Sequence, residues 1–313
     1  MRARAPMAVA SAVILGTAGA VQSADAQAPR ARQGLLSTED ARLFYEVVGA
    51  GEPIIVVHGG PGLDHNYLQP GLDVLAASHT LIYYDQRGTG RSSAELDAAS
   101  INIDAFVEDI DALRETLGYE RVSVLAHSFG ALIALEYASR HPDRLRGLIL
   151  MNPVEPGSLF RAQTEERQAR ARTAEDSTDL ATLASGEGYA ARDPATLSAV
   201  YRVAFRQTMR NRDRVDELDL DLSASTAKNG QDVARLLGGS MGPPMWWDRL
   251  ADIDVPTLVL HGRYDLPPVD MSRALADSMA ASLVVLESGH FPYVEDRNGL
   301  ISAVSGFLAG LRR

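Results

Sequence analysis

Short apolar runs recur along the chain, separated by amphipathic stretches. Most of these runs are continuous rather than alternating, which is typical of parallel strands covered on both faces. The runs cover residues 54–57, 80–84, 122–126, 148–151, 257–260 and 283–286. Residues 43–48 alternate between apolar and polar side chains instead, so we expect them to pair with 34–37 as an antiparallel edge of the sheet.

Helical spacing fills several of the segments between the predicted strands. Apolar side chains recur every three or four residues in 103–117, a helix that Gly118 ends. Further helices are predicted over 131–139 and about 300–311. Strands and helices that alternate in this way indicate an α/β fold with a doubly wound, mostly parallel sheet.

Residues 155–248 break this rhythm. No strand is evident there and charges are dense, with Glu166 and Arg170 at the four-residue spacing of an exposed helix. The segment is too long to be a loop in a compact domain. We therefore predict that 155–248 form a helical cap, or lid, inserted into a core built from 29–154 and 249–313.

Residues 1–28 have the layout of a secretory signal peptide. Two arginines precede the uncharged stretch 7–21, and small residues then form two cleavage patterns that end at Ala26 and Ala28. The apolar stretch is short for a membrane-spanning helix, although an uncleaved anchor is the alternative. We expect cleavage near Ala26 or Ala28 and a secreted or periplasmic protein that is free of the membrane afterwards.

Composition narrows the possible chemistry. The 313 residues are 46% hydrophobic and 23% charged, an ordinary globular composition. The net charge of −11 argues against nucleic acid, whose phosphates attract a basic face. The absence of cysteine excludes a disulfide, a thiolate nucleophile and Cys-ligated zinc, and no metal-binding spacing such as H-E-x-x-H occurs. We expect a small-molecule or short-peptide substrate, no metal and no cofactor. The sequence does not indicate the oligomeric state.

A candidate nucleophile lies between a predicted strand and a predicted helix. Residues 126–130 read Ala-His-Ser-Phe-Gly, a variant of the G-x-S-x-G elbow. The tight turn of such an elbow lifts the serine above the sheet edge, and small neighbours let strand and helix approach closely. Ser128 is therefore the predicted nucleophile.

A serine hydroxyl needs a base and an orienting acid to react. In proteins with this elbow the acid and then the histidine follow the serine along the chain. Asp265 and His290 each lie in the loop that follows a predicted strand, so both should reach the edge of the sheet where Ser128 lies. His290 would accept the serine proton, and Asp265 would fix its tautomer. His127 as the base and Glu155 as the acid are the alternatives.

The oxyanion formed during acyl transfer needs two preorganised N–H donors. Phe129, the residue after the nucleophile, should supply one. The second should come from the loop 58–62, which reads His-Gly-Gly-Pro-Gly. Because Pro61 has no N–H, Gly60 is the expected donor, with Gly59 as the alternative.

These motifs resemble those of the proline iminopeptidase family of α/β-hydrolases, serine aminopeptidases related to the tricorn-interacting aminopeptidases. The resemblance rests on the Ser128 elbow, on Asp265 and His290, on 58–62, and on 85–92, which reads Asp-Gln-Arg-Gly-Thr-Gly-Arg-Ser. It spans nearly the whole chain after the predicted signal peptide. From the residues alone, we interpret 85–92 as a scaffold that braces neighbouring loops.

The resemblance implies an α/β-hydrolase fold with an inserted helical cap. It also implies release of an N-terminal residue, often proline, from short peptides through an acyl-enzyme without a cofactor. Ser128, Asp265 and His290 would be the triad, with Gly60 and Phe129 forming the oxyanion hole. Related esterases share parts of the motifs, so a carboxylesterase or lactonase on the same scaffold is the alternative.

The elbow and the predicted cap leave the substrate open. The family elbow usually reads G-G-S-W/Y-G, so the pocket lining differs here. Family aminopeptidases also hold the substrate ammonium with carboxylates of the cap. The candidate carboxylates here are Glu155, Glu187, Glu217 and Asp219. Trp246 and Trp247 are candidates for lining the acyl pocket, with cap-to-core packing as their alternative role.

Overall fold

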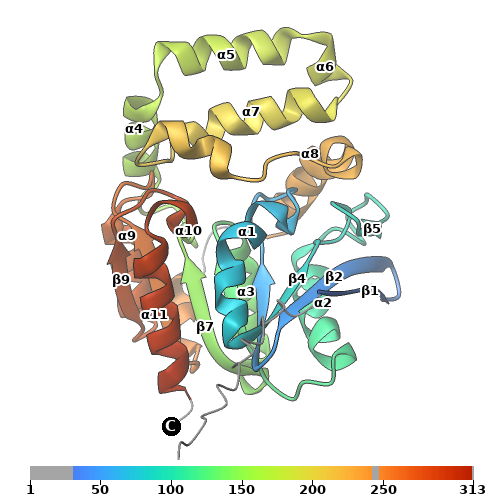
Figure 1. The fold of residues 1–313 in the computed structure, drawn as a ribbon, viewed down its shortest axis with the longest axis vertical. Coiled ribbons are helices and arrows are strands. Elements are labelled where there is room, and N and C mark those ends of the chain that lie inside the picture. Colours follow the sequence, from blue (N-terminus) through green and yellow to red (C-terminus); the bar gives the residue numbers. More distant parts are fainter. Residues whose placement is uncertain (1–30, 242–246, 312–313) are drawn as a thin grey trace, which may run out of the picture.

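The computed structural model describes residues 31–241 and 247–311 (Figure 1). The predicted signal peptide and Trp246 lie outside these residues. Within the described ranges, no helix combines the length and the apolar character that crossing a bilayer requires.

One nine-stranded sheet forms the centre of the molecule, in the order β1-β2-β4-β3-β6-β7-β8-β9, with β5 paired to β2. The strands are β1 (Arg32–Ser37), β2 (Ala41–Gly49), β3 (Glu52–Val57), β4 (His79–Tyr84), β5 (Ser93–Ala94), β6 (Val122–His127), β7 (Leu145–Met151), β8 (Thr257–Gly262) and β9 (Ser282–Leu286). The pairs from β4 to β9 are parallel, whereas β2 runs antiparallel to β1 and to β4. The predicted parallel sheet with an antiparallel edge is confirmed.

Helices on both faces of the sheet explain why its central strands are continuously apolar. They are α1 (Gln69–Leu72), α2 (Ile103–Thr116), α3 (Gly130–Arg140), α9 (Val269–Ser278), α10 (Pro292–Glu295) and α11 (Arg297–Gly310). Successive residues of β3 alternate between two hydrophobic clusters. Ile55 and Val57 pack in the cluster that contains α2, α3 and α9, and Ile54 and Val56 in the one that contains α1 and α11. Both faces of the strand are therefore buried, as the sequence pattern predicts.

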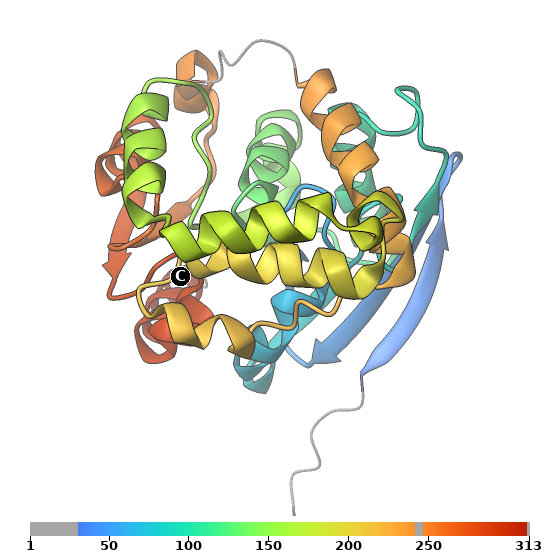
Figure 2. The same ribbon diagram turned by 90° about the horizontal axis from the view of Figure 1, so that it is seen from above.

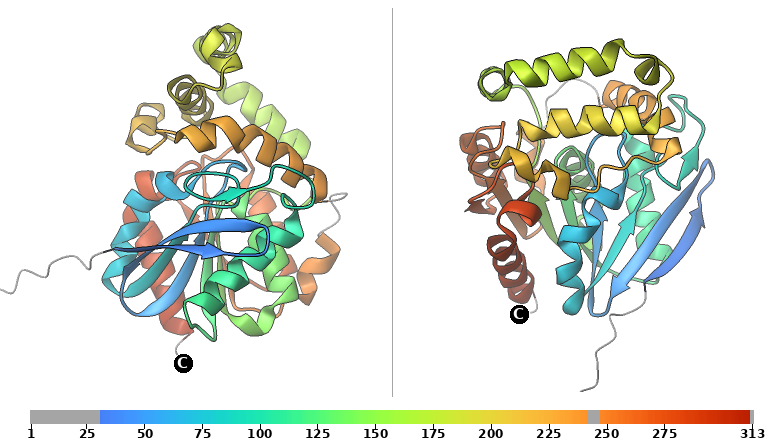
Figure 3. Two further views of the ribbon diagram at one scale, coloured as in Figure 1. Left: turned by 90° about the vertical axis from the view of Figure 1, so that its right-hand side faces the viewer. Right: turned by 45° about the horizontal axis from the view of Figure 1, so that its top comes forward.

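The connection from β7 to β8 forms a helical layer over one end of the sheet (Figures 1 and 2). Its helices are α4 (Arg161–Ala171), α5 (Ala174–Ser185), α6 (Glu187–Ala190), α7 (Pro194–Arg206) and α8 (Ala224–Ser240). Two 3-10 turns, Arg212–Glu217 and Trp247–Asp252, complete it. Seen from above, α5 and α7 lie side by side between α4 and α8. β7 runs towards this layer, so the carboxyl ends of the parallel strands face it (Figures 1 and 3).

The loop 85–92 braces its surroundings, as interpreted from the sequence. The buried Asp85 carboxylate lies 2.6 Å from His65 Nδ1 and accepts a hydrogen bond from Arg91 N–H at 2.7 Å. Arg87 forms two hydrogen bonds, of 2.8 and 2.6 Å, with the buried carboxylate of Asp109 on α2. These contacts connect the loop to the 3-10 turn His65–Tyr67 and to α2.

Candidate active site

Ser128 occupies a sharp turn between β6 and α3. Its φ of 55° lies in the left-handed region, which is uncommon for a residue with a Cβ atom and is found mainly where surrounding structure holds it. Two residues after Ser128, the close approach of α3 to β3 requires a glycine. A Cβ atom on Gly130 would lie 2.5 Å from His58 O and 2.6 Å from Val57 O. The turn leaves Ser128 partly exposed to solvent.

The structure brings the three predicted residues of the triad into one hydrogen-bonded chain. Ser128 Oγ lies 2.9 Å from His290 Nε2, and His290 Nδ1 lies 2.8 Å from Asp265 Oδ2. Asp265 follows β8 and His290 follows β9, so both reach the carboxyl edge of the sheet. An ionised carboxylate only accepts hydrogen bonds, so the proton is on Nδ1 and Nε2 is free to accept the serine proton.

Asp265 is buried, with 1% of its surface exposed, yet it remains ionised. Burial alone would raise the pKa of this carboxyl. The charge and hydrogen bond of His290, together with the Asn152 amide, outweigh burial and hold the pKa below its ordinary value. Asn152 Nδ2 donates to Asp265 Oδ2 at 2.7 Å, and Leu266 N–H donates to Oδ1 at 2.7 Å.

Sequence reasoning missed Asn152. This residue directly follows β7 and adopts a φ of 47°. Its amide also donates to Gly289 O at 3.1 Å, so it connects the loops that carry Asp265 and His290. Its place at the carboxyl end of a buried strand was the signal that could have identified it.

The two expected oxyanion donors are free in the described part of the chain, where neither Gly60 N–H nor Phe129 N–H makes a hydrogen bond. Gly59 N–H instead donates to Tyr67 Oη at 2.7 Å, which removes it from the candidates. The φ of 128° at Gly60 belongs to the region that favours glycine. This conformation accounts for glycine at that position.

His127 and Glu155 do not replace His290 and Asp265. His127 is buried and both its ring nitrogens are engaged, one with His290 O and one with Tyr67 Oη, each at 2.9 Å. Burial, reinforced by the neighbouring charge of His290, lowers the pKa of His127 to about 3. Glu155 Oε1 accepts from Phe160 N–H at 3.0 Å, whereas the carboxylate that reaches His290 is Asp265.

Two buried neutral histidines should make stability fall in mild acid. Burial lowers the pKa of His58 to about 4 and that of His127 to about 3. In the unfolded chain both histidines have a pKa near 6.5. Between that value and the lower pKa values of the fold, the unfolded chain binds more protons than the folded one. Each ring therefore destabilises the fold by about 1 kcal/mol per pH unit as the pH falls. Raised pKa values at Asp64 and Asp109 offset part of this loss.

We therefore expect the free energy of unfolding to drop by roughly 3 kcal/mol between pH 6.5 and 4.5, measured by urea denaturation. His127→Gln should make the slope shallower because one buried imidazole is gone. His141→Gln, at a partly exposed histidine, is the matched control for the loss of an imidazole outside the core. A flat profile for the unmodified protein would contradict the expectation.

The predicted carboxylates for substrate binding separate into one that lies near the elbow and three that are exposed. Glu155 is partly buried and adjoins Val154, whose N–H lies 3.4 Å from Ser128 O. Glu187, Glu217 and Asp219 are exposed.

Glu217 forms an ion pair with Arg214 at the surface. Both of its oxygens accept hydrogen bonds from Arg214, at 2.6 and 2.7 Å, in a surface ion pair. Arg214 lies three residues earlier, so the pairing was visible as an i,i+3 spacing.

The two tryptophans remain only partly described. Trp246 lies outside the described residues. Trp247 is half-buried, and its ring centroid lies 6.3 Å from that of Phe160. It also packs against the hydrophobic cluster that contains α3. Trp247 therefore joins the helical connection to the core, which was the alternative role considered for it.

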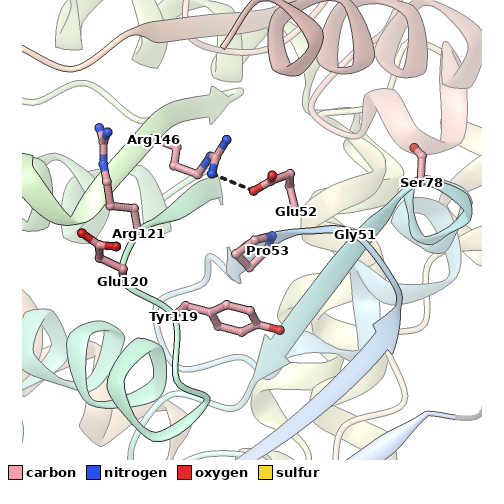
Figure 4. Close-up of a pocket in the computed structure, with 8 residues that line it drawn as sticks. All are labelled: Gly51, Glu52, Pro53, Ser78, Tyr119, Glu120, Arg121 and Arg146. Carbon is pink, nitrogen blue, oxygen red and sulfur yellow. Dashed lines mark ion pairs between the residues drawn. The ribbon is translucent and has the colours of Figure 1, made fainter. Parts of the chain in front are cut away.

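A surface pocket of about 650 Å³ has no residue of the triad in its lining (Figure 4). Its lining includes Glu52 at the start of β3 and Arg146 near the start of β7, joined by an ion pair of 2.8 Å. The amino ends of these strands form the sheet edge opposite Ser128. In the described ranges, no group of three or more His, Asp or Glu side chains is placed to hold a metal ion.

Comparison with known proteins agrees with the α/β fold described above. Residues 52–297 match the family model described as alpha/beta hydrolase fold. The chain is 26% identical over 285 residues to a proline iminopeptidase of Saccharolobus solfataricus, covering 85% of this chain and 87% of the relative. A crystal structure of a proline iminopeptidase from Mycobacterium smegmatis matches with a TM-score of 0.70 and 25% identity over 90% of this chain and 98% of that one. A thermophilic esterase from Thermogutta terrifontis shares the fold, with a TM-score of 0.67 and 24% identity over 90% of this chain and 100% of that one.

Proposed function

The chain belongs to the α/β hydrolase fold family, and on that premise we propose that it is a serine hydrolase acting through a covalent acyl-enzyme. The observation that carries the proposal is the hydrogen-bonded chain from Ser128 Oγ through His290 to Asp265. A shared fold alone would not support an activity, because related folds host many chemistries.

The geometry supports the following reaction sequence. As Ser128 Oγ attacks the acyl carbon, His290 Nε2 accepts its proton, and the buried carboxylate of Asp265 stabilises the imidazolium. The N–H groups of Gly60 and Phe129 bind the developing oxyanion. His290 then donates the proton to the leaving amine or alcohol, which leaves an acyl group on Ser128. Water, deprotonated by His290, releases the acid and restores the serine.

For the substrate, we propose an aminopeptidase of proline iminopeptidase type. It would release an N-terminal residue, proline or another small or apolar one, from short peptides. The support is the name of the relatives, the resemblance of the motifs at 58–62 and 85–92 to those of that family, and the partly buried Glu155 carboxylate near the elbow. Export remains a prediction from residues 1–28.

One observation favours a carboxylesterase or lactonase instead. Among the described residues between β7 and β8, the one buried carboxylate is Asp176, and Arg212 binds it with hydrogen bonds of 2.7 and 2.6 Å. This pairing leaves Asp176 unsuited to hold a substrate ammonium. Prolyl and alanyl arylamides, tested beside a short-chain p-nitrophenyl ester, separate the two functions. Arylamide turnover would support the aminopeptidase, and turnover of the ester alone would contradict it.

Replacing Glu155 tests whether it binds the substrate ammonium. We expect Glu155→Gln to raise KM for prolyl arylamide about tenfold or more, because a hydrogen bond between two charges contributes about 1.5–3 kcal/mol. The amide oxygen can still accept from Phe160 N–H, so folding should be kept. Glu217→Gln is the matched control and should change KM less than about twofold. Equal KM values for both variants would show that Glu155 does not bind the amine.

A further inference from the structure

We infer that His127 is a positioning residue that ties the backbone of His290 to the oxyanion loop through a directed chain of hydrogen bonds. The inference rests on the proposed serine hydrolase function. The chain runs from Gly59 through Tyr67 and His127 to His290. His290 enters this chain through its backbone carbonyl, and neither the Tyr67 nor the His127 side chain forms a hydrogen bond with the serine hydroxyl. His127 therefore acts through His290 rather than on the substrate.

The direction of each hydrogen bond follows from the groups at its ends. His290 O can only accept, so His127 Nε2 carries the proton of the 2.9 Å bond to it. His127 Nδ1 must then accept, and the Tyr67 hydroxyl donates to it at 2.9 Å. The lone pair of that hydroxyl accepts from Gly59 N–H at 2.7 Å. Every donor has an acceptor and only the neutral imidazole satisfies all three bonds.

The surroundings keep both side chains in the required protonation states. His127 and Tyr67 are 1% and 3% exposed, with ring centroids 5.6 Å apart. The His127 ring also lies 4.8 Å from His290 and 5.6 Å from Phe291. Burial keeps the pKa of His127 low and that of Tyr67 high. The histidine is therefore uncharged and the tyrosine retains its proton at neutral pH.

The chain fixes one of the two backbone groups of His290. Its C=O is held by His127, from the elbow, and its N–H donates at 2.9 Å to Thr208 O, from the helical connection. These anchors set the position from which the imidazole reaches Ser128 Oγ. A displacement of about 1 Å between reacting groups can lower a rate about 100-fold.

The same chain selects the oxyanion donor. Because Gly59 N–H is engaged with Tyr67, it cannot turn towards a substrate, and Gly60 N–H is left for that role. The residue before the nucleophile thus connects two parts of the site that must keep their spacing. A glycine at this position would offer no side chain for this connection.

Two substitutions at position 127 test the inference. In His127→Leu, we expect kcat to fall about 30-fold or more on whichever substrate is hydrolysed, with KM within about threefold. In His127→Gln, an amide N–H and oxygen can replace the two ring nitrogens, so kcat should stay within about fivefold of the unmodified enzyme. The pH at which kcat/KM falls in acid should be the same in His127→Gln, since His127 is neutral in that range.

Tyr67→Phe is the second probe, chosen because it leaves the His127 ring in place. We expect a loss in kcat of about three- to tenfold, and little further loss when it is added to His127→Leu, because the two changes break one chain. Thermal melting of each variant verifies that the comparison is made on folded protein.

The outcomes are distinguishable. If His127→Leu is as fast as the unmodified enzyme, the positioning role is wrong while the serine hydrolase stands. A folded His127→Gln that is as inactive as His290→Ala would show that His127 itself moves the proton and would overturn the inference. Equal losses of kcat and melting temperature in the Gln and Leu variants would reduce His127 to a packing role. An unmodified protein that hydrolyses neither arylamides nor esters would overturn the proposed function, and with it the inference.

Discussion

Replacing Ser128 by alanine is expected to lower kcat/KM by at least about 10⁴-fold, because the nucleophile of a Ser-His-Asp chain has no substitute. The substitution removes one oxygen atom and keeps the Cβ atom, so the elbow and its hydrogen bond from Ser128 N–H to Met151 O should persist. The measurement is steady-state turnover of the substrate that the unmodified enzyme hydrolyses fastest.

Ser123→Ala is the matched control for this experiment. Ser123 is buried in β6, the strand that leads to the elbow, five residues before the nucleophile, and the hydrogen bond that His290 makes with a serine goes to Ser128. We expect its kcat/KM to change less than about threefold. Residual activity above about one per cent in folded Ser128→Ala would show that another group forms the bond to the substrate.

Asp265→Asn is expected to lower kcat by about 10⁴-fold, the effect known for a triad acid whose amide imposes the wrong histidine tautomer. The surroundings of Asp265 leave the amide no good orientation. Placed at Oδ2, the NH₂ group would face two donors, His290 Nδ1–H and the Asn152 amide. Placed at Oδ1, it would face Leu266 N–H.

The first orientation forces the His290 proton onto Nε2. That nitrogen can then no longer accept a hydrogen bond from the Ser128 hydroxyl. The second leaves two facing N–H donors in a buried site, which destabilises the loop. Asp270→Asn, at an exposed aspartate on α9, is the control and should retain activity within about twofold. A folded Asp265→Asn with near-normal kcat would contradict the role assigned to Asp265.

Much of the fold and of the triad could be predicted from the sequence, for a physical reason. A strand buried on both faces has a continuous apolar pattern, and the carboxyl ends of parallel strands share one edge. The polar residues that follow β6, β8 and β9 therefore had to lie near one another. Ser128, Asp265 and His290 are those residues, and the structure joins them by hydrogen bonds.

The contacts between loops could not be predicted in the same way. Asn152 pairs with Asp265, Tyr67 with His127 and Thr208 with His290. These partners lie 60 to 113 positions apart in the chain, and no local spacing encodes them. The sequence could not single out the carboxylate that binds the substrate, for a related reason. The helical connection carries many acidic residues, and most of them are exposed at the surface. Glu217 illustrates this, since its neighbour Arg214 already satisfies it.

Covalent labelling tests most directly whether Ser128 is the activated nucleophile. Purified protein would be treated with a fluorophosphonate, digested and mapped by mass spectrometry, with His290→Ala alongside. We expect a single adduct on the peptide containing Ser128, formed at least about 10³-fold more slowly in His290→Ala. An adduct on another residue, or equal labelling of both proteins, would contradict the assignment of Ser128 and His290 as nucleophile and base.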